Sequence, residues 1–400
     1  MKIDIAQRQF SLPSFDIPRA VLALWLLHIV ISLAFGFYLQ ANPELPEAPQ
    51  FSTPDWAGNL AHWDVNWELS ITDQGYAPDF YPQTSAKFPL ASLFARILHQ
   101  LFSFPVQVAL FVVNKIGVLA GLWALWRLIA HLYDPSTANR AVCYISFPLF
   151  GTSFIYWMSY PDPLFLAWWA LAFEALFTGR PYRAGLWATL GVWTRPQGAL
   201  LMPVFALSIL IESLKIYGFR PTLLKPAFWS NILSACLLPS LALIAWVIRV
   251  SDVTAIPFSP YAAQRDVRPT GLIWPWQRIA DRFQRMLSQP QANTFGTWLE
   301  SWHIVLIVFL LIVLIVIYWR GHLRWELLLF TVLSMFLPLM TGIFGIGRFA
   351  TLTWLPLAFV YIVPAKYRWL DWLLWSVAIF LSLVVFLALN IFSQQAGYVP

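Results

Sequence analysis

Residues 302–319, "WHIVLIVFLLIVLIVIYW", decide the fold class, because they contain no Asp, Glu, Lys or Arg and are almost entirely large and apolar. An α-helix needs ~20 such residues to cross the hydrocarbon core of a bilayer. Residues 17–40 form a second apolar run, in which Arg19 is the one charged residue. Membrane-spanning strands would instead alternate apolar and polar side chains. The sequence therefore predicts an all-α polytopic membrane protein.

The composition supports this class. Of 400 residues, 59% are hydrophobic, 17% are aromatic and only 11% are charged, which is more apolar surface than a soluble domain of this length can bury. The net charge is +6, but no basic tract exceeds two residues, so nucleic acid is not an expected partner. Cys143 and Cys236 lie within apolar runs and offer neither a disulfide framework nor a cysteine metal site.

The apolar runs predict a single domain, 1–400, with about eleven transmembrane helices. Alternate connections are rich in Lys and Arg, and the positive-inside rule places these connections in the cytoplasm. Residues 41–104 and 251–302 then form two large external loops, and the first helix is retained because it lacks a cleavage site. The predicted spans are 18–40, 105–130, 138–158, 162–179, 184–194, 197–213, 228–250, 303–319, 325–343, 347–363 and 369–393.

Two segments of the external loops have the periodicity of amphipathic helices. Residues 88–104, "FPLASLFARILHQLFSF", place large apolar side chains on one stripe, with Ser92, Arg96 and His99 on the other side. Residues 276–289, "WQRIADRFQRMLSQ", repeat the pattern. Such helices lie in the membrane interface. They are either packed connectors or walls of a groove that holds a lipid substrate.

Carboxylates gather in residues 59–76, "NLAHWDVNWELSITDQGY", which follow the first apolar run. Most acids of this loop need no explanation beyond a solvated external segment without positive charge. Asp64 differs, because Trp63 and Trp67 flank it. An apolar setting would raise its pKa towards the working range of a general base. Alternatively, Asp64 caps a short helix.

Other polar residues interrupt apolar surroundings on the predicted external side. Asp162, in "YPDP", is either a helix cap or a site residue. Arg195, in "WTRPQG", is a functional candidate because a charge at membrane depth is costly, and its partner is Asp64, Asp162 or a bound phosphate. Arg348, in "GIFGIGRF", either binds a ligand or reaches towards the headgroups. Asn114 and Lys115, within a span, are expected in helix–helix contacts.

One carboxylate base and several deep arginines suit transfer of a sugar from a lipid phosphate. Asp64 would take the proton of an acceptor hydroxyl as that oxygen attacks the anomeric carbon, and the arginines would stabilise the departing phosphate. This one-step displacement inverts the anomeric centre. The predicted catalytic residues are Asp64 and Asp162. The predicted phosphate-binding residues are Arg195, Arg348, Arg265, Arg268 and Lys87, with Trp63, Trp67, Glu68, Tyr76 and Gln197 in support.

These residues carry a resemblance to a known family. "HWDVNWELSITDQGY" (62–76) followed by "KFPL" (87–90) resembles the "W-D … I-A … G-Y … F-F-P-L" signature of PIG-V-type mannosyltransferases and their prokaryotic relatives. "YPDPLF" (160–165) and "TRPQGALL" (194–201) resemble that family's "Y-S-E-S-L-F … L-T-R-x-x-G", and "GRF" (347–349) loosely matches its "P-R-Y" element.

The resemblance implies a GT-C glycosyltransferase fold with an outward-facing active site. It implies a polyprenyl-phosphate sugar donor, most often of mannose, and matches Asp64 to the loop carboxylate, Asp162 to the second acidic position and Arg195 to the "T-R" arginine. The chain has no N-x-[ST] sequon, which favours a prokaryotic plasma membrane. A lipid, glycan or protein hydroxyl would then be the acceptor.

Two other classes stay open. The Pro-interrupted pair 184–213 also suits a transporter or flippase of a lipid-linked or anionic substrate, and a non-catalytic binding subunit would need no base. We expect no cofactor and no metal, because His62, Asp64 and Glu68 do not have a dependable ligand spacing.

Overall fold

The structure is a computed structural model that describes residues 17–42, 55–61, 64–219, 223, 225–267, 273–288, 295–341 and 345–396. Throughout these residues the regular elements are helices, without strands, as predicted. Among these residues, six helices are long and apolar enough to cross a membrane. They are α1 (Arg19–Ala41), α4 (Val106–Leu132), α9 (Leu201–Tyr217) with the 3-10 turn η5 (Pro196–Leu200) before it, α11 (Pro226–Thr254), α14 (Phe295–Trp319) and α18 (Arg368–Ala396).

The predicted count of about eleven spans is not confirmed, because several expected spans are short or broken. Residues 138–158 form α5 (Pro135–Ser146) and the single turn α6 (Phe154–Trp157). Pro148 and Gly151, which has a φ of 68°, lie in the break between them. Proline cannot donate the helical hydrogen bond, and a left-handed glycine reverses the chain.

Residues 347–363 are also broken. They form α16 (Ile346–Thr351), the 3-10 turn η7 (Leu355–Ala358) and α17 (Phe359–Ile362). The Thr353 hydroxyl donates to the carbonyl of Ala350 and accepts from the backbone N–H of Leu355. These local bonds compete with a continuous helix, and a periodicity argument does not detect them.

The centre of the molecule is the packing of α4 against the buried helix α7 (Asp162–Phe177). Gly121 of α4 permits it, because a Cβ at Gly121 would lie 2.7 Å from the carbonyl oxygen of Pro163. Helix α8 (Pro181–Val192) packs between α7 and α11. The first turn of α7, which contains Asp162, is therefore held by close backbone contact.

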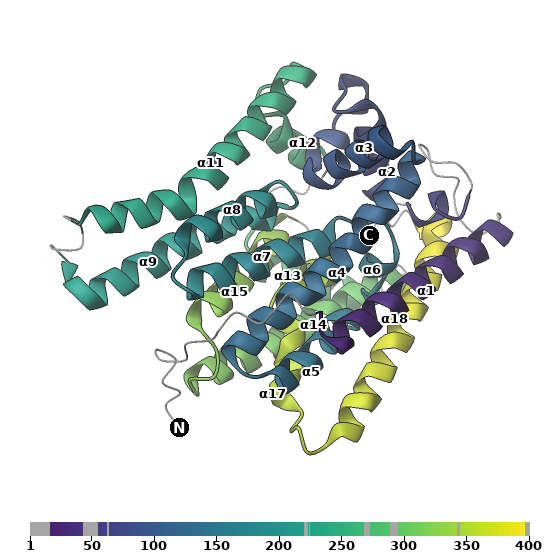
Figure 1. Cartoon of the computed structure of the whole chain (residues 1–400). Coiled ribbons are helices and arrows are strands. Elements are labelled where there is room, and N and C mark those ends of the chain that lie inside the picture. Colours follow the sequence, from purple (N-terminus) through teal and green to yellow (C-terminus); the bar gives the residue numbers. More distant parts are fainter. Residues whose placement is uncertain are drawn as a thin grey trace.

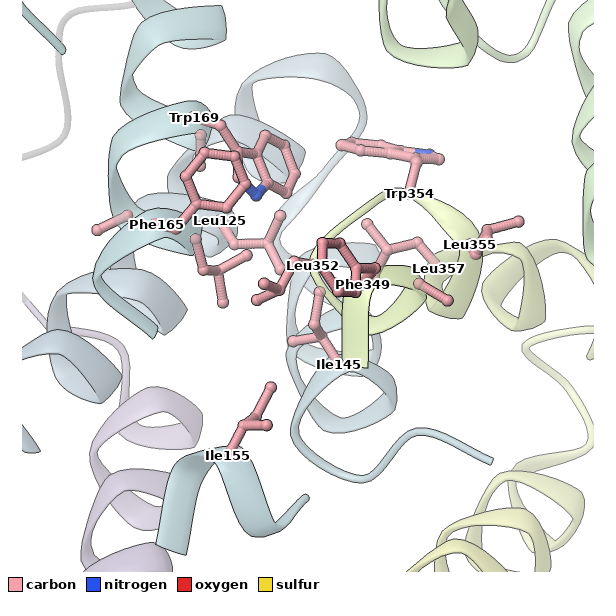
Figure 2. Close-up of a cluster of buried hydrophobic side chains, with 14 of the residues drawn as sticks. Leu125, Ile145, Ile155, Phe165, Trp169, Phe349, Leu352, Trp354, Leu355 and Leu357 are labelled. Atoms are coloured by element: carbon pink, nitrogen blue, oxygen red, sulfur yellow. The ribbon is translucent and has the colours of Figure 1, made fainter. Parts of the chain in front are cut away.

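Buried aromatic side chains join α7 to the C-terminal third of the chain. The ring of Trp169 lies 5.8 Å from that of Phe330 in α15 (Trp325–Thr341) and 6.2 Å from that of Trp354. Figure 2 shows Phe165 and Trp169 on one side of this cluster and Trp354 and Leu355 on the other. This apolar core sets the position of α16 relative to α7.

Asn114 and Lys115 of α4 form the helix–helix contacts that were predicted for them. The Asn114 amide donates to the carbonyls of Ile155 and Tyr160 at 3.2 and 2.7 Å. Lys115 Nζ donates to Ser32 of α1 at 2.7 Å and to the carbonyls of Tyr156 and Trp157. The broken turn α6 leaves carbonyls without helical partners, and these two side chains satisfy them.

Short elements of the predicted external loops gather at one end of the molecule. Figure 1 shows α2 (Asp64–Gln74), α3 (Leu90–Phe102) and α12 (Ser259–Val267) grouped beside one end of α11. Helix α3 contacts α2, and α12 contacts the 3-10 turn η4 (Thr84–Ala86). This end of the bundle is where the polar candidates meet.

Helix α3 forms over the first segment whose periodicity predicts an amphipathic helix, and much of its apolar stripe faces away from the protein. Leu93, Ile97 and Leu101 are exposed, whereas Ser92 is buried. The small residues of α3 face the protein because they let α2 approach, and the apolar stripe faces outwards, as suits a helix in the membrane interface. In the second predicted amphipathic helix, α13 (Pro275–Ser288), Trp276 is exposed in the same way.

Candidate active site

A cavity of about 490 Å³ opens at the end of the bundle where α2 and α12 lie. The charged residues of its lining are Asp64, Glu68, Lys87, Asp162, Arg195 and Arg348. Its apolar lining includes Phe88, Trp246, Val247, Pro260, Tyr261 and Phe349. No described residue of α3 or α13 lines it, so neither amphipathic helix is a wall of this cavity; α12 supplies that wall instead. A cavity with charged side chains beside a mostly apolar wall fits an amphiphilic ligand.

Five charged side chains form a continuous chain of ion pairs along the cavity. Lys87 Nζ lies 2.6 Å from Asp64 Oδ1, and Arg348 Nη2 lies 2.9 Å from Asp64 Oδ2. Arg348 Nε lies 3.7 Å from Asp162 Oδ1, and Arg195 Nη1 lies 2.6 Å from Asp162 Oδ2. Five distant segments thus place their charges together in the order Lys87, Asp64, Arg348, Asp162, Arg195. The structure brings together residues that the sequence had placed only on one side of the membrane.

Asp64 is the first residue of α2, and its side chain is 28% exposed. Burial raises the pKa of its carboxyl, but the charges of Lys87 and Arg348 outweigh burial and hold the pKa well below its usual range. The expectation of a raised pKa is therefore wrong, because two cations at hydrogen-bond distance stabilise the ionised form. Asp64 is a persistent anion that holds Lys87 and Arg348.

Asp162 begins α7 and is fully buried. The N-cap position is Pro161, and no side chain caps the helix. The Asp162 carboxylate instead accepts from Arg195 at 2.6 Å, so ordinary helix capping does not account for it. At the N-terminus of α7 its charge is also stabilised by the helix dipole. The sequence allowed Asp64, Asp162 or a phosphate as the partner of Arg195, and in the structure Arg195 pairs with Asp162.

Arg195 is held rigidly where α8 ends and η5 begins. Gly198 makes this turn possible, because a Cβ there would lie 2.3 Å from the backbone carbon of Gly191. The Arg195 Nε donates to Gln197 Oε1 at 3.2 Å, and the guanidinium lies 4.7 Å from the centre of the Phe349 ring. The side chain is buried, so its charge faces the cavity rather than bulk water.

Arg348 lies on the short helix α16 and is only 7% exposed. Its guanidinium lies 4.9 Å from the centre of the Tyr160 ring and lines the cavity, so it does not reach towards the headgroups. Its Nη1 atom is buried and has no hydrogen-bond partner among the described residues. An unpaired donor on a buried cation is costly, and an anionic ligand would satisfy it.

Two of the predicted supporting residues, Tyr76 and Gln197, are not in the cavity lining but contact residues that are. Tyr76 donates its hydroxyl to the carbonyl of Lys87 at 2.9 Å and accepts from Trp246 Nε1 at 3.1 Å. It thereby ties the segment before α3 to α11. Gln197 is fully buried beside Arg195, and its Nε2 has no partner among the described residues.

Glu68 is more than a supporting residue. Its carboxylate is 4% exposed, lines the cavity, and accepts a hydrogen bond of 2.5 Å from Ser92 Oγ. Burial raises its pKa to about 7. The sequence offered no signal for this, because the contact with Ser92 depends on how α3 packs against α2.

Other predicted residues lie elsewhere. Arg265 is exposed, pairs with Asp266 at 3.4 Å and is not in the cavity lining, so its predicted contact with phosphate is not supported by the structure. Trp67 is also not in the lining. Trp63 and Arg268 lie outside the described residues. The sequence reasoning missed Tyr160, although it is adjacent to "PDP", and Trp246, which nothing distinguishes from other aromatic residues of an apolar span.

In the part of the chain that the structure describes, no group of three or more His, Cys, Asp or Glu is placed to hold a metal ion. The expectation that no metal is needed stays a prediction.

Comparisons with known proteins find similarity to solved structures only at low sequence identity. No family model matches the chain, and no curated protein matches its sequence. One similar solved structure is the archaeal oligosaccharyltransferase AglB from Archaeoglobus fulgidus, in complex with an inhibitory peptide and a dolichol-phosphate. It is 13% identical, with a TM-score of 0.47, and the match covers 95% of this chain and 56% of that one.

A second is the Archaeoglobus fulgidus oligosaccharyltransferase complex with Zn and sulfate, which is 13% identical with a TM-score of 0.40. That match covers 94% of this chain and 53% of the other, so this chain spans little more than half the length of the proteins it resembles.

Proposed function

We propose that this protein is an inverting membrane glycosyltransferase of the GT-C class, similar to the PIG-V-type enzymes. It would move a sugar, with mannose as the first candidate, from a polyprenyl-phosphate donor to a hydroxyl of a lipid, glycan or protein at the outer face of a prokaryotic plasma membrane. The observation that carries the proposal is the cavity, in which a chain of buried ion pairs meets an apolar wall.

The charges of the cavity suit a phosphodiester. Of the described residues that line it, Lys87, Arg195 and Arg348 are cations, and Asp64 and Asp162 are the carboxylates paired with them. The five ion-paired side chains carry one net positive charge; Glu68, which also lines the cavity, lies outside this chain of ion pairs. A sugar linked through one phosphate to a lipid carries one negative charge, which balances that positive charge. The open Nη1 donor of Arg348 supplies a direct contact for a phosphate oxygen.

The apolar wall suits the lipid part of the same donor. Trp246 and Val247 come from α11, Tyr261 from α12 and Pro338 from α15. These side chains contact the cavity next to the charged residues. A polyprenyl chain would lie against this wall with its phosphate at the cations, because burial of each CH₂ contributes about 0.8 kcal/mol.

The reaction is a single displacement. An acceptor hydroxyl oxygen forms a bond to the anomeric carbon on the face opposite the phosphate. The bond from that carbon to the phosphate oxygen breaks, and its electron pair leaves with the phosphate. The proton of the hydroxyl passes to a carboxylate of the cavity. The leaving phosphate gains one negative charge, which the preorganised cations stabilise.

The test is transfer of labelled mannose from polyprenyl-phosphate mannose in membranes that contain the wild type, Arg348→Lys, Arg348→Ala or Arg249→Ala. Arg249 is an exposed arginine of α11 that is not in the cavity lining, and it serves as the matched control. We expect transfer by the wild type and Arg249→Ala, reduced transfer by Arg348→Lys and the lowest transfer by Arg348→Ala, since a lysine keeps the charge but not the guanidinium fork. Absence of transfer by the wild type with any polyprenyl-phosphate sugar would contradict the proposal and favour transport or binding.

A further inference from the structure

Glu68 differs from the two other carboxylates of the cavity. Asp64 lies within 3 Å of Lys87 and Arg348, and Asp162 lies 2.6 Å from Arg195. Glu68 forms no ion pair with any described residue, and its carboxylate accepts a hydrogen bond from the neutral hydroxyl of Ser92. A buried carboxylate without a cation keeps a proton more readily than its paired neighbours do.

The position of Glu68 is set by the contact between α2 and α3. Ala91 and Ala95 of α3 are buried, and these small side chains allow the two helices to approach. Ser92 Oγ then lies 2.5 Å from Glu68 Oε2 and 3.2 Å from the Glu68 carbonyl oxygen. The hydroxyl donates the shorter hydrogen bond to the carboxylate and so fixes its position. This contact directs the end of Glu68 at the cavity.

The charged and titratable groups that face Glu68 come from several elements. Lys87 follows η4, Asp64 lies one turn earlier on α2, and Arg195 precedes η5; all three act on Glu68 through their charges. Glu68 in turn acts on Tyr76. Lys87 and Arg195 favour the ionised form of Glu68, and Asp64 opposes it.

We propose that Glu68, positioned by Ser92, accepts the proton of the acceptor hydroxyl, and that Asp64 instead holds Lys87 and Arg348 in place for the phosphate. This assignment rests on the proposed glycosyl transfer. It gives different roles to two carboxylates of helix α2, which are four residues apart and therefore lie on the same face.

The proton transfer favours Glu68 over Asp64 for a chemical reason. As the acceptor oxygen bonds to the anomeric carbon, its proton moves to a Glu68 oxygen, and the sugar–phosphate bond electrons leave with the phosphate. A proton on Asp64 would weaken its bonds to Lys87 and Arg348 just when the phosphate needs both cations. A proton on Glu68 disturbs no ion pair, and its pKa of about 7 suits a base at neutral pH.

The first experiment measures the proton on Glu68 without any donor. The purified protein is treated with dicyclohexylcarbodiimide, which modifies protonated carboxyl groups in apolar surroundings, from pH 5 to pH 9, and the modified Glu68 peptide is quantified by mass spectrometry. We expect modification to fall through a midpoint near pH 7. In Ser92→Ala the midpoint should move to higher pH, because the hydroxyl stabilises the ionised form. A midpoint below pH 5 in the wild type would overturn the assignment.

The second experiment measures sugar transfer against pH for the wild type, Ser92→Ala, Glu68→Gln and Asp73→Asn. Asp73 is an exposed carboxylate of the same helix and serves as the matched control. We expect the wild-type rate to rise with pH through about 7 and the same rise, shifted upwards, in Ser92→Ala. Glu68→Gln should lose about 10²–10⁴ of the rate together with the pH dependence, as removal of a general base does.

The two experiments separate the possible failures. Transfer by the wild type combined with an unchanged rate and pH profile in Glu68→Gln would overturn the base assignment and leave the glycosyltransferase proposal in place. A Glu68 midpoint near pH 7 without transfer from any donor would overturn the proposed function and, with it, the catalytic role of Glu68. A shift of both midpoints in Ser92→Ala distinguishes positioning of Glu68 from a merely structural role, which would lower the rate at every pH.

Discussion

At the scale of single residues, the cavity depends on charges that are buried only because they are paired. Asp162 is fully buried, and Arg195 and Arg348 both share it. Loss of one member leaves another charge buried without a partner, which costs more than the pair itself contributes. The arginines were found from the sequence because a charge among apolar residues is conspicuous. Their partners were not fixed there, because pairing depends on the packing of α7, α8 and α16.

Asp162→Asn should destabilise the protein by ~3–5 kcal/mol, the usual cost of breaking a buried pair. The matched control is Asp252→Asn, since Asp252 lies 3.7 Å from Arg249 on an exposed face and such pairs contribute ~0–1 kcal/mol. The unfolding temperature of each variant is measured in the same detergent from the loss of soluble protein on heating. Equal unfolding temperatures for the two variants would contradict the account of the buried pair.

Glu68 should make stability depend on pH in a defined direction. Burial raises its pKa from 4.5 to about 7, so the folded state holds a proton that the unfolded chain has lost between these values. Its contribution to the free energy of unfolding is complete below pH 4.5 and is lost as the pH rises to about 7. The total loss is at most ~3 kcal/mol. Glu68→Gln should therefore be more stable than the wild type at pH 8 and similar at pH 4.5. A difference that does not change with pH would show that Glu68 is not buried as described.

At the scale of elements, the turn between α8 and η5 positions the Arg195 side chain in the cavity lining. Gly198→Ala would place a Cβ 2.3 Å from the backbone of Gly191, and neither backbone segment can yield without moving Arg195. The matched control is Gly191→Ala, whose Cβ meets nothing closer than 3.5 Å. We expect Gly198→Ala to lose most transfer activity and to unfold at a lower temperature, and Gly191→Ala to keep both. Wild-type behaviour of Gly198→Ala would contradict this role of the turn.

The sequence predicted the elements unevenly, for physical reasons. Helices such as α4 and α14 were found because membrane spans are long, apolar and uninterrupted. The segments 138–158 and 347–363 were predicted as spans because their composition is equally apolar, although turns interrupt both. Their backbone groups are satisfied by Lys115, Asn114 and Thr353, and such long-range partners leave no periodic trace. The contact between Glu68 and Ser92 was missed for the same reason.

At the scale of the whole molecule, the charged cavity lies at the end of the helical bundle where α2 and α12 are grouped (Figure 1), and many large apolar side chains of the bundle are exposed. The distribution of Lys and Arg predicts that this end faces outwards, and an introduced cysteine tests it. In a background with Cys143→Ser and Cys236→Ser, Asp79→Cys should react with a membrane-impermeant maleimide in intact cells. Arg320→Cys, in the loop before α15, should react only after the membrane is opened. The reverse pattern would contradict the proposed orientation.

The central claim is that the cavity transfers a sugar from a lipid phosphate in one displacement. The most direct measurement is the anomeric configuration of the product that the purified wild type forms in liposomes from polyprenyl-phosphate mannose, determined by NMR. The account predicts a product whose configuration is opposite to that of the donor, with far less product from Arg348→Ala. A product that retains the donor configuration, or equal product from Arg348→Ala, would contradict it.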